Sequence, residues 1–261
     1  MEAVVNGAFE RLKRTILHIQ EFTMLSYRGF ANLLSRPRYW QDTFDMMDVM
    51  GVGSLTIVCL TGLFTGMVLT VQSSATLDAF GARPYVGRMV SLSMIRELGP
   101  VLTSLMVAGR VGSGMAAELG SMVVTLQIDA MRALGTDPIR KLVTPRLVSG
   151  VIMVPVLTVL SDAVGMLGGY LVARFTLRLA TEFYWHSAID AIKMEDIIMG
   201  LAKPFVFGYI VVAVGCYLGL STRGGTQGVG ESTTRSVVMA SVLILASDYF
   251  LNLLILHFVY P

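Results

Sequence analysis

The sequence is poor in charge and in the residue types that build metal sites and disulfides. Charged residues make up 15% of the 261 residues and hydrophobic residues 54%, whereas a soluble domain has about 25% charged residues. The two cysteines, Cys59 and Cys216, lie inside apolar runs, and the three histidines are scattered. This excludes a disulfide framework and zinc-type ligand spacing. A net charge of +2 gives no reason to expect a nucleic-acid partner.

Catalytic signatures are missing as well. The chain contains no GxxxxGK[ST] motif, so we expect no ATP binding through a P-loop. It has no clustered His, Cys, Asp and Glu set of the kind that a membrane-embedded enzyme needs. Four charged residues interrupt the N-terminal segment before any apolar core forms, so we expect no signal peptide. The sequence therefore predicts a chain that is not an enzyme and binds no metal or cofactor itself.

Long apolar runs are what the chain does have, and its mean hydropathy is +0.68. A membrane-spanning helix needs about 20 mostly apolar residues. Five runs qualify: 49–77, about 89–117, 147–173, 204–222, and 236 to the C-terminus. Pro204 is expected at the first turn of the fourth span, where its missing N–H costs nothing. The sequence predicts an all-α membrane protein with an N-terminal interfacial segment (1–48) and a transmembrane domain (49–261).

Lysine and arginine predict the orientation. The N-terminal segment, second loop and fourth loop together carry about twice as many of these residues as the first loop, third loop and C-terminal tail. Lys203 is counted in the third loop. Cytoplasmic loops carry this excess, which favours the N-terminus inside and the C-terminus outside.

An apolar stripe precedes the first span at steps of three and four residues: Val5, Phe9, Leu12, Ile16 and Ile19. This pattern favours an amphipathic helix on the inner membrane surface. A soluble helix packed on the domain is the open alternative.

Five charged residues fall inside the predicted spans: Arg96, Glu97, Arg110, Asp162 and Asp248. Each costs about 2.5–3.5 kcal/mol at a helix centre, so we expect none of them to face lipid tails. For Arg110 the alternative is that it snorkels to the interface. For the two aspartates the simple alternative is that they pair with other helices. Arg96 and Glu97 precede Gly99-Pro100 near the predicted outer end of the second span, which favours a site for a polar headgroup. Glycine pairs of the GxxxG type, at 62 and 66, 165 and 169, and 215 and 219, predict tight helix packing.

The second cytoplasmic loop predicts a short helix over 128–134. Gly135 is a natural helix stop, and Asp137-Pro138 is a natural start for the next helix. Met131 and Leu134 would be exposed unless a partner docks on them. We interpret this helix as a contact for a motor protein, with a membrane-surface connector as the alternative.

At several motifs the chain resembles the MlaE/YrbE family of ABC permeases. The matching segments are 96–100 (RELGP), 108–113 (AGRVGS), 117–120 (AELG), 127–130 (QIDA) with 135–138 (GTDP), 66–69 (GMVL) with Gln72, and 233–235 (TTR). The resemblance implies a homodimeric permease in the bacterial inner membrane that moves phospholipid between the inner and outer membranes. It also implies a cytoplasmic MlaF-like ATPase that binds ATP and Mg²⁺, a MlaB-like STAS protein and a periplasmic MlaD-like MCE-domain protein.

The resemblance also assigns residues. Those similar to lipid-binding residues of the family are Leu69, Gln72, Phe80, Arg96, Glu97 and Arg235, with Phe80 standing where some relatives have tyrosine. Those in the segment similar to the ATPase-coupling helix are Ile128, Asp129, Met131, Arg132, Leu134 and Asp137. Val123 and Leu126 stand where many relatives have arginine and glutamate, which removes two charges near the expected ATPase contact.

A rival interpretation comes from another class of transporter. An ion- or proton-coupled secondary transporter could use Asp162 and Asp248 inside the membrane. That class favours internal repeats, and the sequence contains none, so we prefer the ATP-driven permease.

Overall fold

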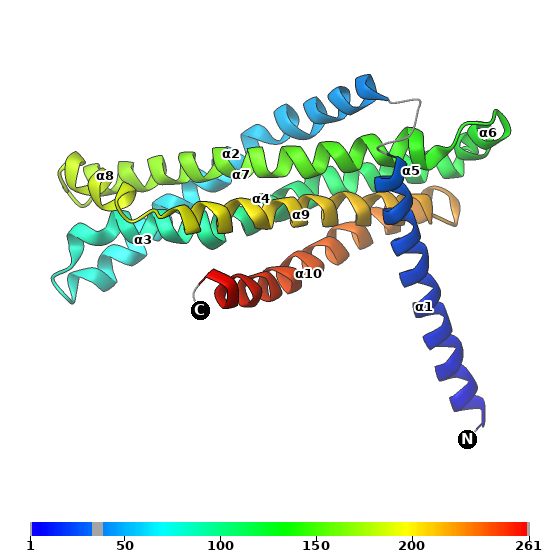
Figure 1. Ribbon diagram of the computed structural model, residues 1–261, viewed down its shortest axis with the longest axis horizontal. Helices are drawn as coiled ribbons and strands as arrows, with labels where there is room; N and C mark the ends of the chain where they lie inside the picture. The colour runs from blue at the N-terminus through cyan, green and yellow to red at the C-terminus, as the bar shows by residue number, and fades with distance from the viewer. Residues whose placement is uncertain (1, 33–38, 260–261) are drawn as a thin grey trace.

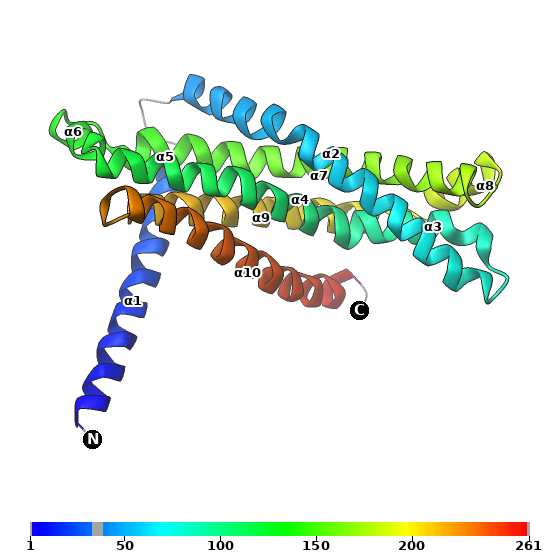
Figure 2. The same ribbon diagram turned by 180° about the vertical axis from the view of Figure 1, so that it is seen from behind.

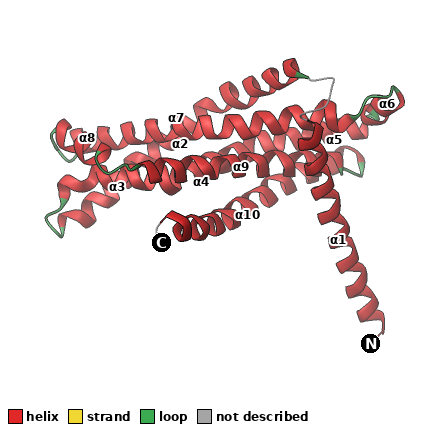
Figure 3. Cartoon of the chain, in the orientation of Figure 1, coloured by secondary structure: helices red, strands yellow, loops and turns green. Residues whose placement is uncertain are grey.

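The computed structural model describes residues 2–32 and 39–259, which form helices and loops without a strand (Figure 3). Five helical segments are long and apolar enough to cross a membrane: Trp40–Asp78, Arg83–Val124, Ile139–Phe175, Met194–Leu220 and Gly225–Ile255. The predicted all-α membrane class and its five spans are confirmed. The predicted orientation in the membrane stays a prediction.

The elements follow one another along the chain with short connections. They are α1 (Glu2–Ala31), α2 (Trp40–Asp78), η2 (Arg83–Tyr85), α3 (Val86–Ser93), η3 (Met94–Leu98), α4 (Gly99–Val107), η4 (Ala108–Gly112), α5 (Ser113–Val124), α6 (Gln127–Ala133), η5 (Ile139–Val143), α7 (Thr144–Phe175), α8 (Thr181–Ile189), α9 (Met194–Leu220) and α10 (Gly225–Val259). The second span is thus a chain of α-helical pieces joined by the π-helical turns η3 and η4. Such π-turns are rare and often occur at functional sites.

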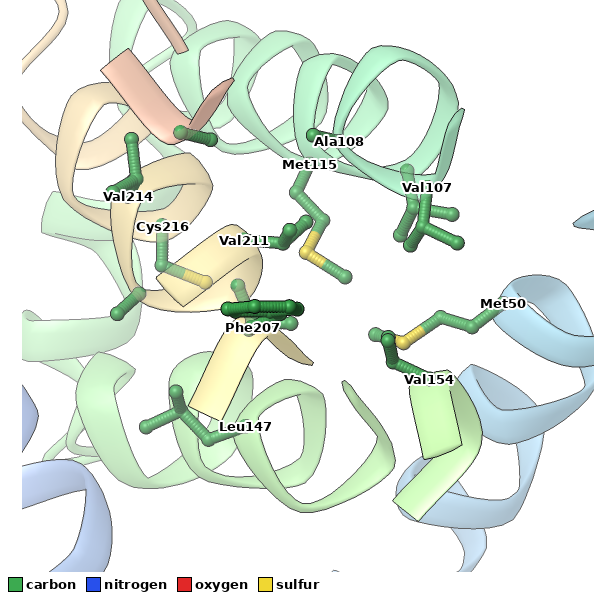
Figure 4. Close-up of a cluster of buried hydrophobic side chains, with 14 of the residues drawn as sticks. Met50, Val107, Ala108, Met115, Leu147, Val154, Phe207, Val211, Val214 and Cys216 are labelled. Carbon is green, nitrogen blue, oxygen red and sulfur yellow. The ribbon is translucent and has the colours of Figure 1, made fainter. Parts of the chain in front are cut away.

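The spans form an elongated bundle in which α6 lies at one end and α8 at the other (Figures 1 and 2). Helix α1 contacts α7 and α9 near its C-terminal end and projects away from the bundle, and the last turns of α10 diverge as well. The apolar core lies where α2, α4, α5, α7 and α9 meet, and Met50, Val107, Met115, Phe207 and Val211 pack in it (Figure 4).

Glycines allow α2 and α7 to approach closely. A Cβ atom added at Gly62 would lie 2.6 Å from the carbonyl oxygen of Ser161, and one at Gly66 would overlap the carbonyl oxygen of Gly165. Gly215 faces the backbone of Gly112 in the same way. Small residues are what lets helices pack this tightly in a membrane, so these glycine pairs serve helix contacts within the chain, as predicted.

The predicted start of the fourth span is wrong. Helix α9 begins at Met194, so Pro204 lies inside it and not at its start. The sequence predicts the first ten residues of α9 as part of the third loop, because Glu195, Asp196 and Lys203 make this segment polar. The structure buries Asp196 and Lys203. Because both charges are paired with other side chains, they can lie inside a span without the cost of an unpaired charge.

Helices α1 and α8, both outside the spans, are anchored differently. Near its end α1 contacts α7, because the Thr144 hydroxyl donates to the Gly29 carbonyl at 3.1 Å. Earlier along α1, Ile16 and Ile19 are exposed to the surroundings of the chain. Helix α8 is held by Tyr184, whose hydroxyl donates to the Met166 carbonyl at 2.9 Å. Burial raises the pKa of the Tyr184 phenol, so it remains a donor at physiological pH.

Candidate functional site

The second span changes its helical register at the predicted headgroup residues. Arg96 and Glu97 lie in the π-turn η3, directly before Gly99 and Pro100. Proline has no N–H to donate to the carbonyl four residues earlier. That carbonyl, of Arg96, accepts a hydrogen bond from Lys203 Nζ at 2.8 Å. The break in the span therefore creates a backbone acceptor for a cation from α9.

Lys203 is the centre of a charged cluster between three spans. Its ammonium group is fully buried and lies 2.9 Å from Glu97 Oε2 and 3.0 Å from Asp248 Oδ1. Asn252, one turn beyond Asp248 on α10, donates to Glu97 Oε2 at 3.2 Å. The cluster joins η3, α9 and α10, and its two carboxylates outnumber its one ammonium. The Glu97 side chain retains 43% exposure, so it is the member of the cluster that a ligand could reach.

Arg96 points to a different partner. Its Nε and Nη2 atoms lie 2.6 and 2.5 Å from Asp196 Oδ1. The other oxygen of Asp196 accepts the Lys193 backbone N–H at 2.9 Å, which caps the start of α9. The structure thus gives the two neighbours different partners: Arg96 pairs with Asp196, and Glu97 pairs with Lys203. The helical segment of the second span begins at Arg83, so the pair lies roughly 20 Å along it, and its predicted place near the outer membrane surface stays a prediction.

An apolar pocket lies against Leu98, the residue that follows Glu97. It has a volume of about 300 Å³ and is lined by Leu69, Gln72 and Leu98, with three further residues of α2. Leu98 directly follows Glu97, so two of the predicted lipid-binding residues lie beside the charged cluster.

The other two predicted lipid-binding residues are elsewhere. Phe80 lies in the turn after α2 with 80% of its side chain exposed, and it does not line this pocket. Arg235 lies early in α10, paired with Glu231 at 2.6 Å. It precedes Asp248 by roughly 20 Å of helix, so the structure separates it from Glu97.

Lys203, Asp196 and Asn252 are the members of the site that the sequence reasoning missed. Lys203 and Asp196 were read as loop residues, although they are seven residues apart and so share one helix face. The residues between them include Ile197, Ile198 and Leu201. This apolar content was the available signal that the span starts before Pro204.

The other charged residues inside the spans differ in whether their polar atoms have hydrogen-bond partners. Arg110 Nη1 donates to Ser54 Oγ at 2.9 Å and to the Val49 carbonyl at 3.2 Å, so it bonds to α2. Asp248 pairs with Lys203, as the simple alternative expected. Asp162 is buried against Gly99, and its Oδ1 has no hydrogen-bond partner in the described residues.

The short helix predicted over 128–134 is present as α6, at Gln127–Ala133, and its coupling role stays a prediction. Gly135 follows it with a left-handed φ of 75°, and the Asp137 carboxylate accepts the Ile139 N–H at 3.0 Å. Leu134 is 84% exposed, whereas Ile128 is buried. Ile128 therefore anchors α6 to the bundle, and its predicted role in an ATPase contact stays a prediction.

The rest of the α6 surface is polar and solvent-accessible. Asp129 and Arg132 form an exposed ion pair at 3.2 Å, and Met131 is partly exposed. Leu126 precedes the helix with a left-handed φ of 60°, which is costly for a residue with a Cβ atom. Val123 lines a large cavity at this end of the bundle.

Five apolar spans around a buried charged cluster, with a short capped helix outside them, define a multi-pass membrane protein whose polar site lies within its spans. The family model described as "Permease MlaE" matches residues 43–254. The chain is 38% identical to a probable ABC transporter permease protein of Rickettsia conorii over 95% of this chain and 96% of that protein. It is 42% identical to a probable ABC transporter permease of Synechocystis, over 87% of each chain.

A third relative has a more specific name. The chain is 36% identical to the intermembrane phospholipid transport system permease protein MlaE of Haemophilus influenzae, over 95% of this chain and 97% of that protein. The matches span nearly the whole chain, and this chain belongs to the MlaE permease family.

Proposed function

We propose that this chain is the permease subunit of an ATP-driven transporter that moves phospholipids between the inner and outer membranes of a bacterial envelope. The names of its relatives support an ABC permease, and one of them supports phospholipid as the cargo. A secondary transporter that uses Asp162 and Asp248 gains no support, because Asp248 is already paired with Lys203.

The observation that carries the proposal is a charged cluster beside an apolar pocket at membrane depth. Glu97 offers a partly exposed carboxylate, and Leu69 and Leu98 offer apolar surface next to it. A zwitterionic phospholipid presents the same combination of a cationic amine and hydrocarbon. Because the cluster has one more carboxylate than ammonium, an amine at Glu97 would balance its charge.

The assembly that we propose follows from the family and from the exposed surfaces. Two copies of this chain form the permease in the inner membrane, with the N-terminus in the cytoplasm. A MlaF-like ATPase binds α6 and carries the ATP and Mg²⁺. A MlaB-like STAS protein and a periplasmic MlaD-like MCE-domain protein complete the transporter. This chain contributes the lipid path and no catalytic group.

The test is the phospholipid content of the purified complex. Glu97→Ala should reduce the bound phospholipid several-fold and impair outer-membrane integrity in cells, while the ATPase still co-purifies. The fold should survive, because Lys203 keeps Asp248 as its partner. Arg96→Ala should also lower lipid occupancy, because Arg96 positions η3 against α9 through Asp196.

Glu195→Ala is the matched control, since this exposed glutamate lies on the same helix as Asp196 but outside the cluster. It should leave lipid content unchanged. Normal lipid occupancy and normal transport in both the Glu97 and the Arg96 variants would reduce these charges to a structural role.

A further inference from the structure

A cavity of about 840 Å³ lies at the α6 end of the bundle, far from the Glu97 cluster. Helices α1, α5, α6, α9 and α10 all contribute to its wall. Four arginines line it from four different segments: Arg28, Arg132, Arg223 and Arg235. The lining also contains two glutamates, Glu21 and Glu231, so the cavity is positively charged.

The positive charge of the cavity is only partly balanced by neighbours. Arg235 pairs with Glu231 at 2.6 Å and Arg132 with Asp129 at 3.2 Å. Glu21 accepts the Tyr217 hydroxyl at 3.4 Å. The ion pairs found among the described residues include neither Arg28 nor Arg223. Two guanidinium groups therefore face the cavity without a carboxylate partner among the described residues.

Apolar side chains line the same cavity. Met24 and Leu25 come from α1, one turn before Arg28, and Leu220 comes from the end of α9. A cavity for a free anion needs no such surface, whereas a lipid brings hydrocarbon next to its phosphate. Guanidinium groups bind phosphate oxygens through paired N–H donors. Basic pockets between transmembrane helices on the cytoplasmic side bind anionic headgroups.

We infer that this cavity binds the phosphate headgroup of an anionic phospholipid from the leaflet at the α6 end, with Arg28 and Arg223 as its principal phosphate contacts. This inference rests on the proposed orientation, in which that end is cytoplasmic, and not on the proposed cargo. It also gives Arg235 a role in lipid binding at a second site, remote from Glu97. A lipid bound in this cavity would contact α1, α6 and α10 at the same time.

The test uses the full chain purified in detergent and measures lipid binding by native mass spectrometry. The probes are phosphatidylglycerol, which carries net negative charge, phosphatidylcholine, which is neutral overall, and inorganic phosphate. The wild-type chain should bind phosphatidylglycerol in preference to phosphatidylcholine. The double variant Arg28→Gln/Arg223→Gln should bind phosphatidylglycerol at least about tenfold more weakly, because it loses two charge-assisted contacts.

Arg174→Gln is the control, because Arg174 is an exposed arginine in the last turn of α7 at the opposite end. It should retain wild-type affinity for phosphatidylglycerol. Unchanged binding in the double variant would overturn the inference, as would equally tight binding of inorganic phosphate, which would mark a site for free phosphate. If the double variant loses the ATPase but not the lipid, the surface is a protein contact and the inference is also wrong.

These outcomes are independent of the proposed cargo site. Glu97→Ala should leave phosphatidylglycerol binding at the arginine cavity unchanged, so a failure at one site can be told from a failure at the other.

Discussion

At the scale of single residues, Lys203 shows how a membrane span tolerates a fully buried cation. Its ammonium group has three acceptors: two carboxylates and a backbone carbonyl. The carbonyl is available because Pro100 cannot donate to it. An unpaired charge at this depth would cost several kcal/mol, so the cluster must form as a unit.

Replacing Lys203 should therefore be more damaging than its position in an apolar helix suggests. Lys203→Met removes the cation from Glu97 and Asp248 and leaves both carboxylates uncompensated. We expect a loss of about 3 kcal/mol, at the low end for a broken buried pair because Glu97 is partly exposed. The measurement is thermal unfolding of the purified chain in detergent.

Two further variants separate charge from packing. Adding Asp248→Asn to Lys203→Met should restore part of the lost stability, because one uncompensated carboxylate is removed. Lys13→Met, at an exposed lysine of α1, should change nothing. If Lys203→Met melts at the wild-type temperature, the cluster does not stabilise the fold.

The sequence identified half of this site. Arg96, Glu97 and Asp248 stand out because they interrupt apolar runs, and burying a charge needs a specific reason. Their partners could not be predicted, since pairing depends on which helices lie side by side. Lys203 was missed because it follows Glu195 and Asp196, and that polar start resembles a loop until the buried ion pairs are known.

At the scale of elements, α6 combines a buried anchor with an exposed apolar end. Ile128 holds the helix to the bundle, and Leu134 projects from it. Leu134→Glu should abolish or strongly weaken co-purification of the ATPase, because a charge would lose its water in an apolar contact. Membrane insertion and thermal stability should be unchanged, since Leu134 is 84% exposed in the structure.

Met131→Glu should give a weaker version of the same effect, because Met131 is less exposed. Lys13→Glu is a suitable control, as it adds the same acidic group on an exposed face of another helix. Full recovery of the ATPase with both α6 variants would show that the motor binds elsewhere.

The contact between α2 and α7 depends on glycine in a way that makes a separate prediction. Gly66→Ala would place a Cβ atom against the backbone carbonyl of Gly165, which cannot rotate away. We expect a loss of about 1–3 kcal/mol, as for other overpacked interiors. Gly230→Ala is the control, because nothing lies within 4 Å of its added Cβ atom.

Gly230 lies inside helix α10, where alanine is the better helix former by about 0.8–1 kcal/mol. This control should therefore melt at or above the wild-type temperature. Equal melting of the Gly66 variant and the wild type would mean that α2 and α7 can separate without cost.

The sequence predicted which helices the chain forms better than it predicted where they begin and end. Apolar runs and the turn residues Gly135 and Asp137 locate the five spans and α6. The π-turns η3 and η4 leave no periodic signal in the sequence, because one extra residue per turn shifts the pattern without breaking it. The early start of α9 was hidden by charges whose partners lie on other helices.

At the scale of the whole molecule, the spans are covered very unequally. In the apolar 18-residue stretch of each span, 61% of the residues are buried in the fourth span (α9), 22% in the first span and 11% in the fifth span. The first and fifth spans are also the ones beside the site, since α2 lines the apolar pocket and α10 supplies Asp248. Glu97 thus lies at membrane depth on a side of the chain that the chain itself leaves open.

This asymmetry supports the last prediction, that the active permease is a homodimer whose two copies face each other across the side bearing α2 and α10. A carboxylate at this depth is costly against lipid tails, so Glu97 needs a water-filled cavity or a second chain before it. The mass of the chain in mild detergent should correspond to two copies of 28.3 kDa. A cysteine placed at Val242, exposed on α10, should cross-link between copies, whereas one at Phe205, exposed on α9, should not. A stable monomer that still transports lipid with its ATPase would refute the dimer, and cross-linking at Phe205 alone would place the second copy against α9 instead.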